Sequence, residues 1–125
     1  GQIVHLVEEF RQAGMDVTAS IAEEPAGIDP EVSAAAYRVV QEALVNARKH
    51  GTGIVRLAVT VARGNVHIEA VNRRSLDTSD EQTAGGYGLI GMRERAASAG
   101  GRIDIDSDDA LFTLRAVLPV RGRTS

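Results

Sequence analysis

The chain has 125 residues, a formal net charge of −3 and no cysteine, so its length fits one domain with a single core, and disulfides and thiolate metal sites are excluded. The small negative charge argues against a broad nucleic-acid interface, and the two Phe, two Tyr and absent Trp leave few rings for stacking on single strands. No apolar run approaches the roughly 20 residues that span a bilayer and no signal-peptide pattern opens the chain, so we expect a soluble domain.

The first part of the chain predicts a helix, a strand and a second, longer helix. Apolar residues at helical spacing favour a helix from Ile3 to Ala13 that stops at Gly14. A short strand from Met15 to Ala22 should follow. Asp29 is typical of an N-cap and Pro30 of the first helical position, where the missing N–H of proline costs nothing. We therefore expect a long helix from Pro30 to about His50.

A hairpin and a polar segment come next. The β-branched residues of Ile54 to Val61 and of Val66 to Val71 predict two strands, and Arg63-Gly64-Asn65 between them is a turn signal. The stretch from Arg73 to Gly88 is polar, small and charged with almost no apolar anchor, which indicates a mobile loop.

The last part of the chain predicts one helix and two strands. The helix should run from about Leu89 to Ala99 and end at Gly100-Gly101, before strands at Arg102 to Ile105 and Leu111 to Leu118. Most strands are linked by hairpins and there are few helices. We therefore expect a single domain over residues 1–125, an α+β two-layer sandwich whose mixed, mostly antiparallel sheet is covered on one face by about three helices.

The stretch from Gln41 to His50 carries the strongest chemical signal. Residues three or four apart are neighbours on a helix, so Glu42, Asn46 and Lys49 share a stripe apart from the apolar face. They offer a base, an oxygen ligand for a hard cation and a donor for phosphate, which predicts a magnesium-nucleotide site. Taken alone, the stripe also fits a solvated helix face with an ordinary i,i+4 pair of Arg38 and Glu42.

A second signal is Gly86-Tyr87-Gly88-Leu89-Ile90-Gly91-Met92, a glycine-rich turn that opens the last helix. Glycine allows close approach of a ligand, and unpaired N–H groups at a helix start attract phosphate. The letters also match GxGxxG, but a dinucleotide site should follow a buried strand within a βαβ unit, whereas these glycines follow a long polar loop. Plain turn glycines are the other alternative for this segment considered alone.

Together, the two motifs resemble the ATP-binding catalytic domain of bacterial sensor histidine kinases of the nitrate-sensor and desaturase-sensor type. The family pattern Tyr-Arg-x-x-Gln-Glu-Ala-Leu-x-Asn-x-x-Lys-His appears as Tyr37 to His50, and Gly-x-Gly-Leu-x-Gly-Met-Arg-Glu-Arg appears as Gly86 to Arg95. The final strand ends in Leu118-Pro119, as in the family. The resemblance covers nearly the whole chain and implies the Bergerat fold, which type II topoisomerase subunits and certain heat-shock chaperones share.

The resemblance implies a site for ATP and Mg²⁺. Asn46 would ligate Mg²⁺ through its side-chain oxygen, and Glu42 would be the catalytic residue that orients or deprotonates an attacking group or a metal-bound water. Residues Arg73 to Tyr87 would form a lid over the nucleotide. The other cofactor-binding residues would be Lys49 and His50 near the phosphates, Asn72 at the adenine, and Gly86, Gly88, Leu89, Gly91 and Met92 in the glycine box.

The chain departs from the family pattern at three places. Asn72 stands where most members carry an Asp that accepts from the adenine amino group, so adenine recognition should weaken. Arg73-Arg74-Ser75 replaces a Gly-x-Gly turn, and the two arginines either reshape the pocket wall or add phosphate contacts. Phe112 occupies the place of a threonine that is common near the last strand.

The resemblance also implies a function. The domain would donate the γ-phosphoryl group of ATP to a histidine on a separate dimerisation domain, in a cytoplasmic two-component system with a response regulator as indirect partner. Neither His5 nor His67 lies in a phosphoacceptor pattern, so we expect the C-terminal fragment of a longer kinase, unable to autophosphorylate alone. Two alternatives stay open: a degenerate signalling module of the same fold that holds nucleotide weakly or not at all, and an anti-sigma-factor serine kinase.

Overall fold

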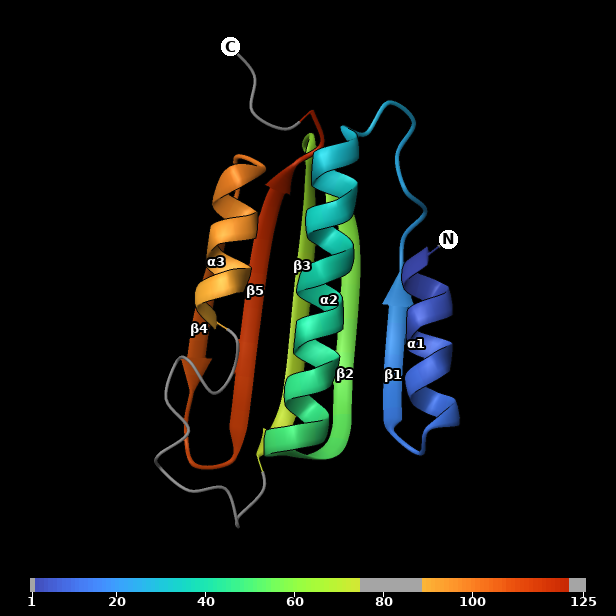
Figure 1. The fold of residues 1–125 in the computed structure, drawn as a ribbon, viewed down its shortest axis with the longest axis vertical. Helices are drawn as coiled ribbons and strands as arrows, with labels where there is room; N and C mark the ends of the chain where they lie inside the picture. Colours follow the sequence, from blue (N-terminus) through green and yellow to red (C-terminus); the bar gives the residue numbers. More distant parts are fainter. Residues whose placement is uncertain (1, 75–88, 122–125) are drawn as a thin grey trace.

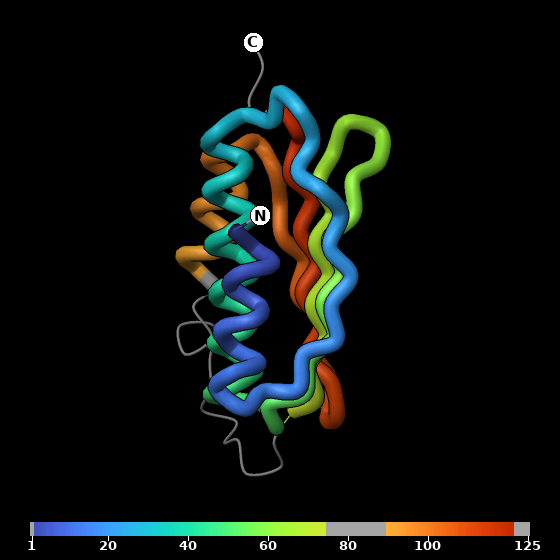
Figure 2. The backbone as a smooth tube through the Cα atoms, turned by 90° about the vertical axis from the view of Figure 1, so that its right-hand side faces the viewer, coloured from blue at the N-terminus to red at the C-terminus, as the bar shows by residue number. Residues whose placement is uncertain are grey.

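The computed structural model describes residues 2–74 and 89–121. The elements follow in the order α1 (Gln2–Gln12), β1 (Asp16–Ile21), α2 (Pro30–His50), β2 (Gly51–Ala62), β3 (Asn65–Arg74), α3 (Leu89–Ser98), β4 (Arg102–Ser107) and β5 (Leu111–Pro119). The strands form one sheet in the order β1-β2-β3-β5-β4, in which β1 and β2 are parallel and the other neighbouring pairs antiparallel. The helices α1, α2 and α3 all lie on one face of this sheet (Figure 1, Figure 2). The predicted α+β sandwich is confirmed.

The strands β2 and β3 are longer than predicted at one shared end. β2 starts at Gly51, directly after α2, and β3 continues to Arg74, where the two residues pair across a bulge. The added residues include two glycines at 51 and 53 and two arginines at 73 and 74, which have low or neutral strand propensity, so pairing with the neighbouring strand sets these ends. The predicted lid start at Arg73 is therefore wrong, because Arg73 and Arg74 belong to β3. The rest of the predicted lid lies outside the described residues.

The start of α2 is fixed by its cap and by the end of β5. Asp29 has extended backbone angles and its side chain accepts a 2.8 Å hydrogen bond from the N–H of Glu31, as an N-cap should. The N–H of Asp29 donates to the carbonyl of Val120 at 2.9 Å, and the N–H of Val120 donates to the carbonyl of Gly64 at 2.8 Å. The first turn of α2, the end of β5 and the β2–β3 turn are thus bonded together.

The β2–β3 turn itself requires two residues with positive φ. Arg63 has φ 54° and Gly64 has φ 78°, the left-handed conformations that a two-residue type I′ turn demands. Such a turn matches the right-handed twist of the flanking strands. The predicted hairpin is confirmed, and Figure 2 shows its tip turned away from the helices.

The hydrophobic core lies between the sheet and the helices, and α2 contributes most to it. Its buried residues include Val32, Val39, Val40, Leu44 and Ala47, each with no exposed surface. None of the described helices covers the opposite face of the sheet, where the side chains of Arg115 and Glu69 meet at 2.8 Å. One buried and one solvated face is the usual arrangement of an antiparallel sheet. Within residues 2–74 and 89–121, no helix combines the length and the apolar character needed to cross a bilayer.

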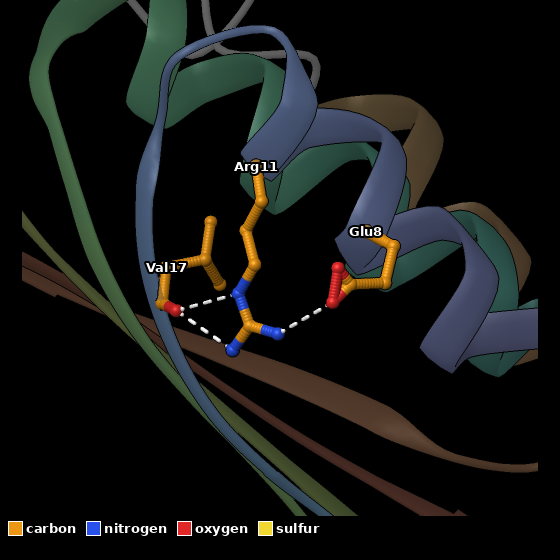
Figure 3. A network of polar contacts seen from close by, with 3 residues as sticks. All are labelled: Glu8, Arg11 and Val17. Carbon is orange, nitrogen blue, oxygen red and sulfur yellow. Dashed lines mark hydrogen bonds and ion pairs between the residues drawn. The ribbon is translucent and has the colours of Figure 1, made fainter.

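The exposed edge of β1 is covered by a side chain from α1 (Figure 3). The Nε and Nη2 atoms of Arg11 donate to the carbonyl of Val17 at 3.0 and 2.9 Å. Its Nη1 atom donates to Glu8 at 3.0 Å. Unpaired edge carbonyls invite another strand, so this guanidinium both anchors α1 and protects the sheet edge.

Candidate functional site

The last turns of α2 carry the four residues of the first motif that were predicted to belong to the site. With about 3.6 residues per turn, their order around the helix axis is Lys49, Glu42, Asn46, His50. Burial increases along the first three: Lys49 is exposed, Glu42 is half-buried and Asn46 is only 3% exposed, and His50 is also buried at 9% exposed. The stripe therefore crosses from solvent into the domain, whereas the sequence predicted one polar face. Asn46 and His50 point inward because the stripe runs along the border of the core face.

Asn72 lies near the end of β3, next to the end of α2. It is 6% exposed, and its Nδ2 atom donates a long hydrogen bond of 3.4 Å to the carbonyl of Arg73. A Cβ placed on Gly51 would lie 2.6 Å from the Nδ2 of Asn72 and 2.8 Å from the carbonyl oxygen of Ala47. Glycine is therefore required at this junction of α2 and β2, because any side chain would displace Asn72 or the last turn of α2.

Among the described residues, the polar side chains that are buried are Asn46, His50 and Asn72. All three lie at the same end of the core, since Gly51 follows His50 and contacts Asn72. Burying a polar group costs free energy unless it is hydrogen-bonded, and Asn46 and His50 both have interaction partners. A few convergent polar groups at one end of an apolar core are typical of a ligand site. We call this group the polar junction.

The arginine that ends β3 is bonded to the turn between β4 and β5. Arg74 donates from Nη1 to the carbonyl of Asp108 at 2.8 Å, and its N–H donates to the carbonyl of Ala110 at 2.8 Å. The Asp108 side chain accepts 2.8 Å hydrogen bonds from the N–H groups of Ala110 and Leu111. The Leu111 bond, then the Ala110 bond and the charge of Arg74, lower the pKa of Asp108 from its ordinary value. These bonds hold Arg74 against the β4–β5 turn, and the two roles predicted for the arginines stay predictions.

The described part of the glycine box lies at the start of α3. Gly91 lines, with Arg38 of α2 and Arg95 of α3, a surface hollow of about 380 Å³ between these helices. Met92, predicted to contact the cofactor, has no exposed surface and belongs to the hydrophobic core. Leu89 is the first residue of α3, and Gly86 and Gly88 lie outside the described residues.

The side-chain oxygen atoms at the end of α2 suit a cation whose coordination shell is completed by phosphate oxygens. In the described part of the chain, no three His, Asp or Glu side chains gather into a group that could hold a metal ion by themselves. Mg²⁺ in nucleotide sites takes one or two protein oxygens and completes its shell with phosphates and water. The amide oxygen of Asn46 and the carboxylate of Glu42, one helical turn earlier, are oxygens of the required kind.

Two features of this site were not predicted from the sequence. The need for glycine at position 51 had no local signal, because it comes from the close approach of Asn72 and not from the backbone angles of Gly51. The bond between Arg74 and Asp108 had none, because these residues are separated by 34 positions and neither lies in a motif.

Sequence comparison identifies relatives among bacterial sensor kinases. No family model matches the chain. Sensor histidine kinase LnrJ of Bacillus subtilis is 34% identical over 113 residues, which is 89% of this chain and 28% of LnrJ. Oxygen sensor histidine kinase NreB of Staphylococcus carnosus is 38% identical over 81 residues, which is 63% of this chain and 23% of NreB. The chain thus spans about a quarter of the length of these relatives.

Structural comparison shows the same fold in a histidine kinase domain. The catalytic domain of the histidine kinase ThkA, in a nucleotide-free form, matches with a TM-score of 0.66 and 16% sequence identity. The match covers 94% of this chain and 86% of the ThkA domain. At this identity the likeness establishes the fold, and the chemistry has to be argued from the residues of the polar junction.

Proposed function

The chain belongs to the sensor histidine kinase family, and we propose that it is the domain that binds Mg²⁺-ATP and donates the γ-phosphoryl group to a histidine on the dimerisation domain of its parent kinase. A response regulator would then receive the phosphoryl group from that histidine. The observation that carries the proposal is the polar junction, where Asn46, His50 and Asn72 are buried together at the end of α2. We propose that this two-component system acts in the cytoplasm.

The orientation of Asn72 supports adenine recognition at this site. Its Nδ2 atom is directed toward the carbonyl of Arg73, so its amide oxygen is the group left to accept from the amino group of adenine. A neutral amide forms a weaker hydrogen bond than a carboxylate. The adenine contact of this chain should therefore be weaker than that of a domain with Asp at this position.

The end of α2 supports binding of the phosphates. Asn46 supplies the protein oxygen for Mg²⁺, and the bound ion would neutralise charge on the transferred phosphoryl group. Glu42 lies one turn before Asn46 and is only half-buried, so it can hold or accept the proton of an attacking imidazole. Lys49 is exposed on the same flank and adds positive charge next to the phosphates.

Thermal unfolding with ADP tests nucleotide binding. ADP with Mg²⁺ at 100 times the dissociation constant should stabilise the domain by about 2.7 kcal/mol, which is roughly a 10 °C rise in Tm for this size. Asn46→Ala should lose the part of the rise that needs Mg²⁺, measured against the Tm of the unliganded variant. Asn65→Ala, in the distant β2–β3 hairpin, should keep it. No rise at millimolar ADP and Mg²⁺ would reject the proposed binding and favour a degenerate module.

A further inference from the structure

A second pocket lies near the other end of α2, between α2, α1 and the sheet. It has a volume of about 350 Å³, at the lower end of the range for small-molecule sites. Aliphatic side chains from every element around it form most of its wall, among them Ile3, Ile21, Ile28, Val59, Val61 and Val66. Val61 is 38% exposed, so part of this wall remains open to solvent.

Among the residues that the structure describes, the charged residues lining this pocket are acidic. Glu23 and Glu24 line it from the segment that joins β1 to α2, and the lining residues within 2–74 and 89–121 include no lysine or arginine. Within the described ranges neither carboxylate belongs to an ion pair, although Glu24 accepts a 2.6 Å hydrogen bond from the hydroxyl of Ser33. Tyr37 also lines the pocket, and aromatic rings attract cations that lie over their faces. The pocket therefore combines an apolar wall with two carboxylates that form no ion pair among the described residues.

This pocket is separate from the polar junction. Tyr37 and Asn46 both lie on α2, and at a rise of about 1.5 Å per residue they are roughly 14 Å apart along the helix axis. Of the residues predicted to bind ATP or Mg²⁺, none of those that the structure describes lines the pocket. A ligand here would not compete directly with nucleotide.

We propose that this pocket binds a small organic cation with an apolar body, of the class of protonated arylalkylamines. The aliphatic wall would remove the apolar body from water, which supplies most of the affinity. The carboxylates of Glu23 and Glu24 would lie next to the ammonium group at the mouth. Because both carboxylates are exposed, they contribute modestly in water and act mainly by selecting a cation over neutral and anionic analogues.

Three probes that differ in charge test this selection. The ¹⁵N-labelled chain is titrated at neutral pH with 2-phenylethylamine, 2-phenylethanol or 3-phenylpropionate, and amide chemical shifts are followed by NMR. The amine should cause saturable shifts around Ile21, Tyr37 and Val61, with a dissociation constant about fivefold below that of the alcohol. The acid should bind more weakly than the alcohol. Equal affinities for the three probes, or shifts centred elsewhere, would overturn the proposal.

Matched variants assign the selection to the two glutamates. The double variant Glu23→Gln, Glu24→Gln should bring the affinity for the amine to that for the alcohol. Glu9→Gln, Asp16→Asn removes the same charge from exposed positions outside the pocket and should keep the preference. If both double variants lose it equally, the selection reflects net charge and the proposal fails.

A third variant tests the pocket itself. Val61→Trp adds bulk at a partly exposed wall position, so the domain should still fold while all three probes lose saturable binding. The NMR spectrum of the variant checks that the fold is kept. Saturable binding of the amine that persists in this folded variant would contradict the assignment.

Discussion

Gly51 and Asn72 approach so closely that a Cβ on Gly51 would lie 2.6 Å from the Nδ2 atom of Asn72. The φ of Gly51 is −114°, which any residue adopts, so glycine is required here for space and not for its conformational freedom. This contact fixes the distance between the end of α2, which carries Asn46, and the strand that carries Asn72. The two ends of the proposed nucleotide site can therefore lie this close only because residue 51 has no Cβ.

Gly51→Ala should destabilise the domain by about 1–3 kcal/mol, the usual cost of forcing an extra carbon into a packed region. The new Cβ would also lie 2.8 Å from the carbonyl oxygens of Ala47 and Arg73, which cannot move aside as a flexible side chain can. Urea unfolding measures the change. In an Asn72→Ala background the cost should fall but remain measurable, because the backbone contacts persist. A cost below about 0.5 kcal/mol in the wild-type background would show that the junction adapts easily.

Asn72→Asp should tighten adenine nucleotide binding by about fivefold, because a carboxylate replaces an amide as the acceptor for the adenine amino group. The bond from Asn72 to the Arg73 carbonyl is long at 3.4 Å, so its loss costs little. Calorimetric titration with ADP gives the affinity. GDP serves as the control ligand, since guanine has no amino group at the corresponding position and its affinity should not rise. Weaker binding of ADP by the variant would show that Asn72 does not contact adenine.

Arg11→Lys should lower the free energy of unfolding by about 1 kcal/mol, because lysine keeps the charge but cannot direct two N–H groups at the Val17 carbonyl. Glu8→Gln is the matched control. The side chains of Arg11 and Glu8 are 39% and 49% exposed, so their ion pair should contribute little. Urea unfolding of the two variants separates the roles. An equal loss in both would mean that the ion pair matters more than the cover on the edge of β1.

Asp108→Asn should lower stability at neutral pH, because an amide accepts the N–H groups of Leu111 and Ala110 less strongly than a carboxylate does. The pKa of Asp108 is lowered in the folded state. Its contribution is therefore complete above the ordinary aspartate pKa and is lost as the pH falls through the lowered value. Unfolding measured from neutral to acidic pH should show the difference between wild type and variant shrinking over that range.

Asp109→Asn is the control for this pH dependence, since it removes the same charge from the neighbouring exposed position. It should change the unfolding free energy less at neutral pH, because Asp108 is the residue that accepts the two turn N–H groups. A difference between wild type and Asp108→Asn that stays constant with pH would contradict the role of the carboxylate charge.

The fold followed from patterns that were local in the sequence. The apolar spacing of Ala36, Val40 and Leu44 marks the core face of α2, and the β-branched runs mark the central parts of the strands. The strand ends at Gly51 and Arg74 carry no such signal. Their extended conformation comes from pairing with each other across the sheet, which depends on residues distant in sequence.

The candidate site was predictable in its residues but not in its packing. The motif from Tyr37 to His50 identified Glu42, Asn46 and Lys49, yet periodicity alone could not decide how far the core face extends around α2. The sheet beneath the helix decides it, burying Asn46 while Lys49 stays in solvent. The bond from Arg74 to Asp108 depends on where the β4–β5 turn lies relative to β3, which only the folded sheet defines.

The most direct test of the proposed function is phosphotransfer between two separate polypeptides, this chain and the dimerisation domain of its parent kinase. With γ-labelled ATP and Mg²⁺, we predict acid-labile label on a histidine of the dimerisation domain, lost with Glu42→Gln, and no label when this chain is incubated alone. Acid-stable label on a serine, or label on this chain by itself, would contradict the proposal that it is the catalytic domain of a histidine kinase.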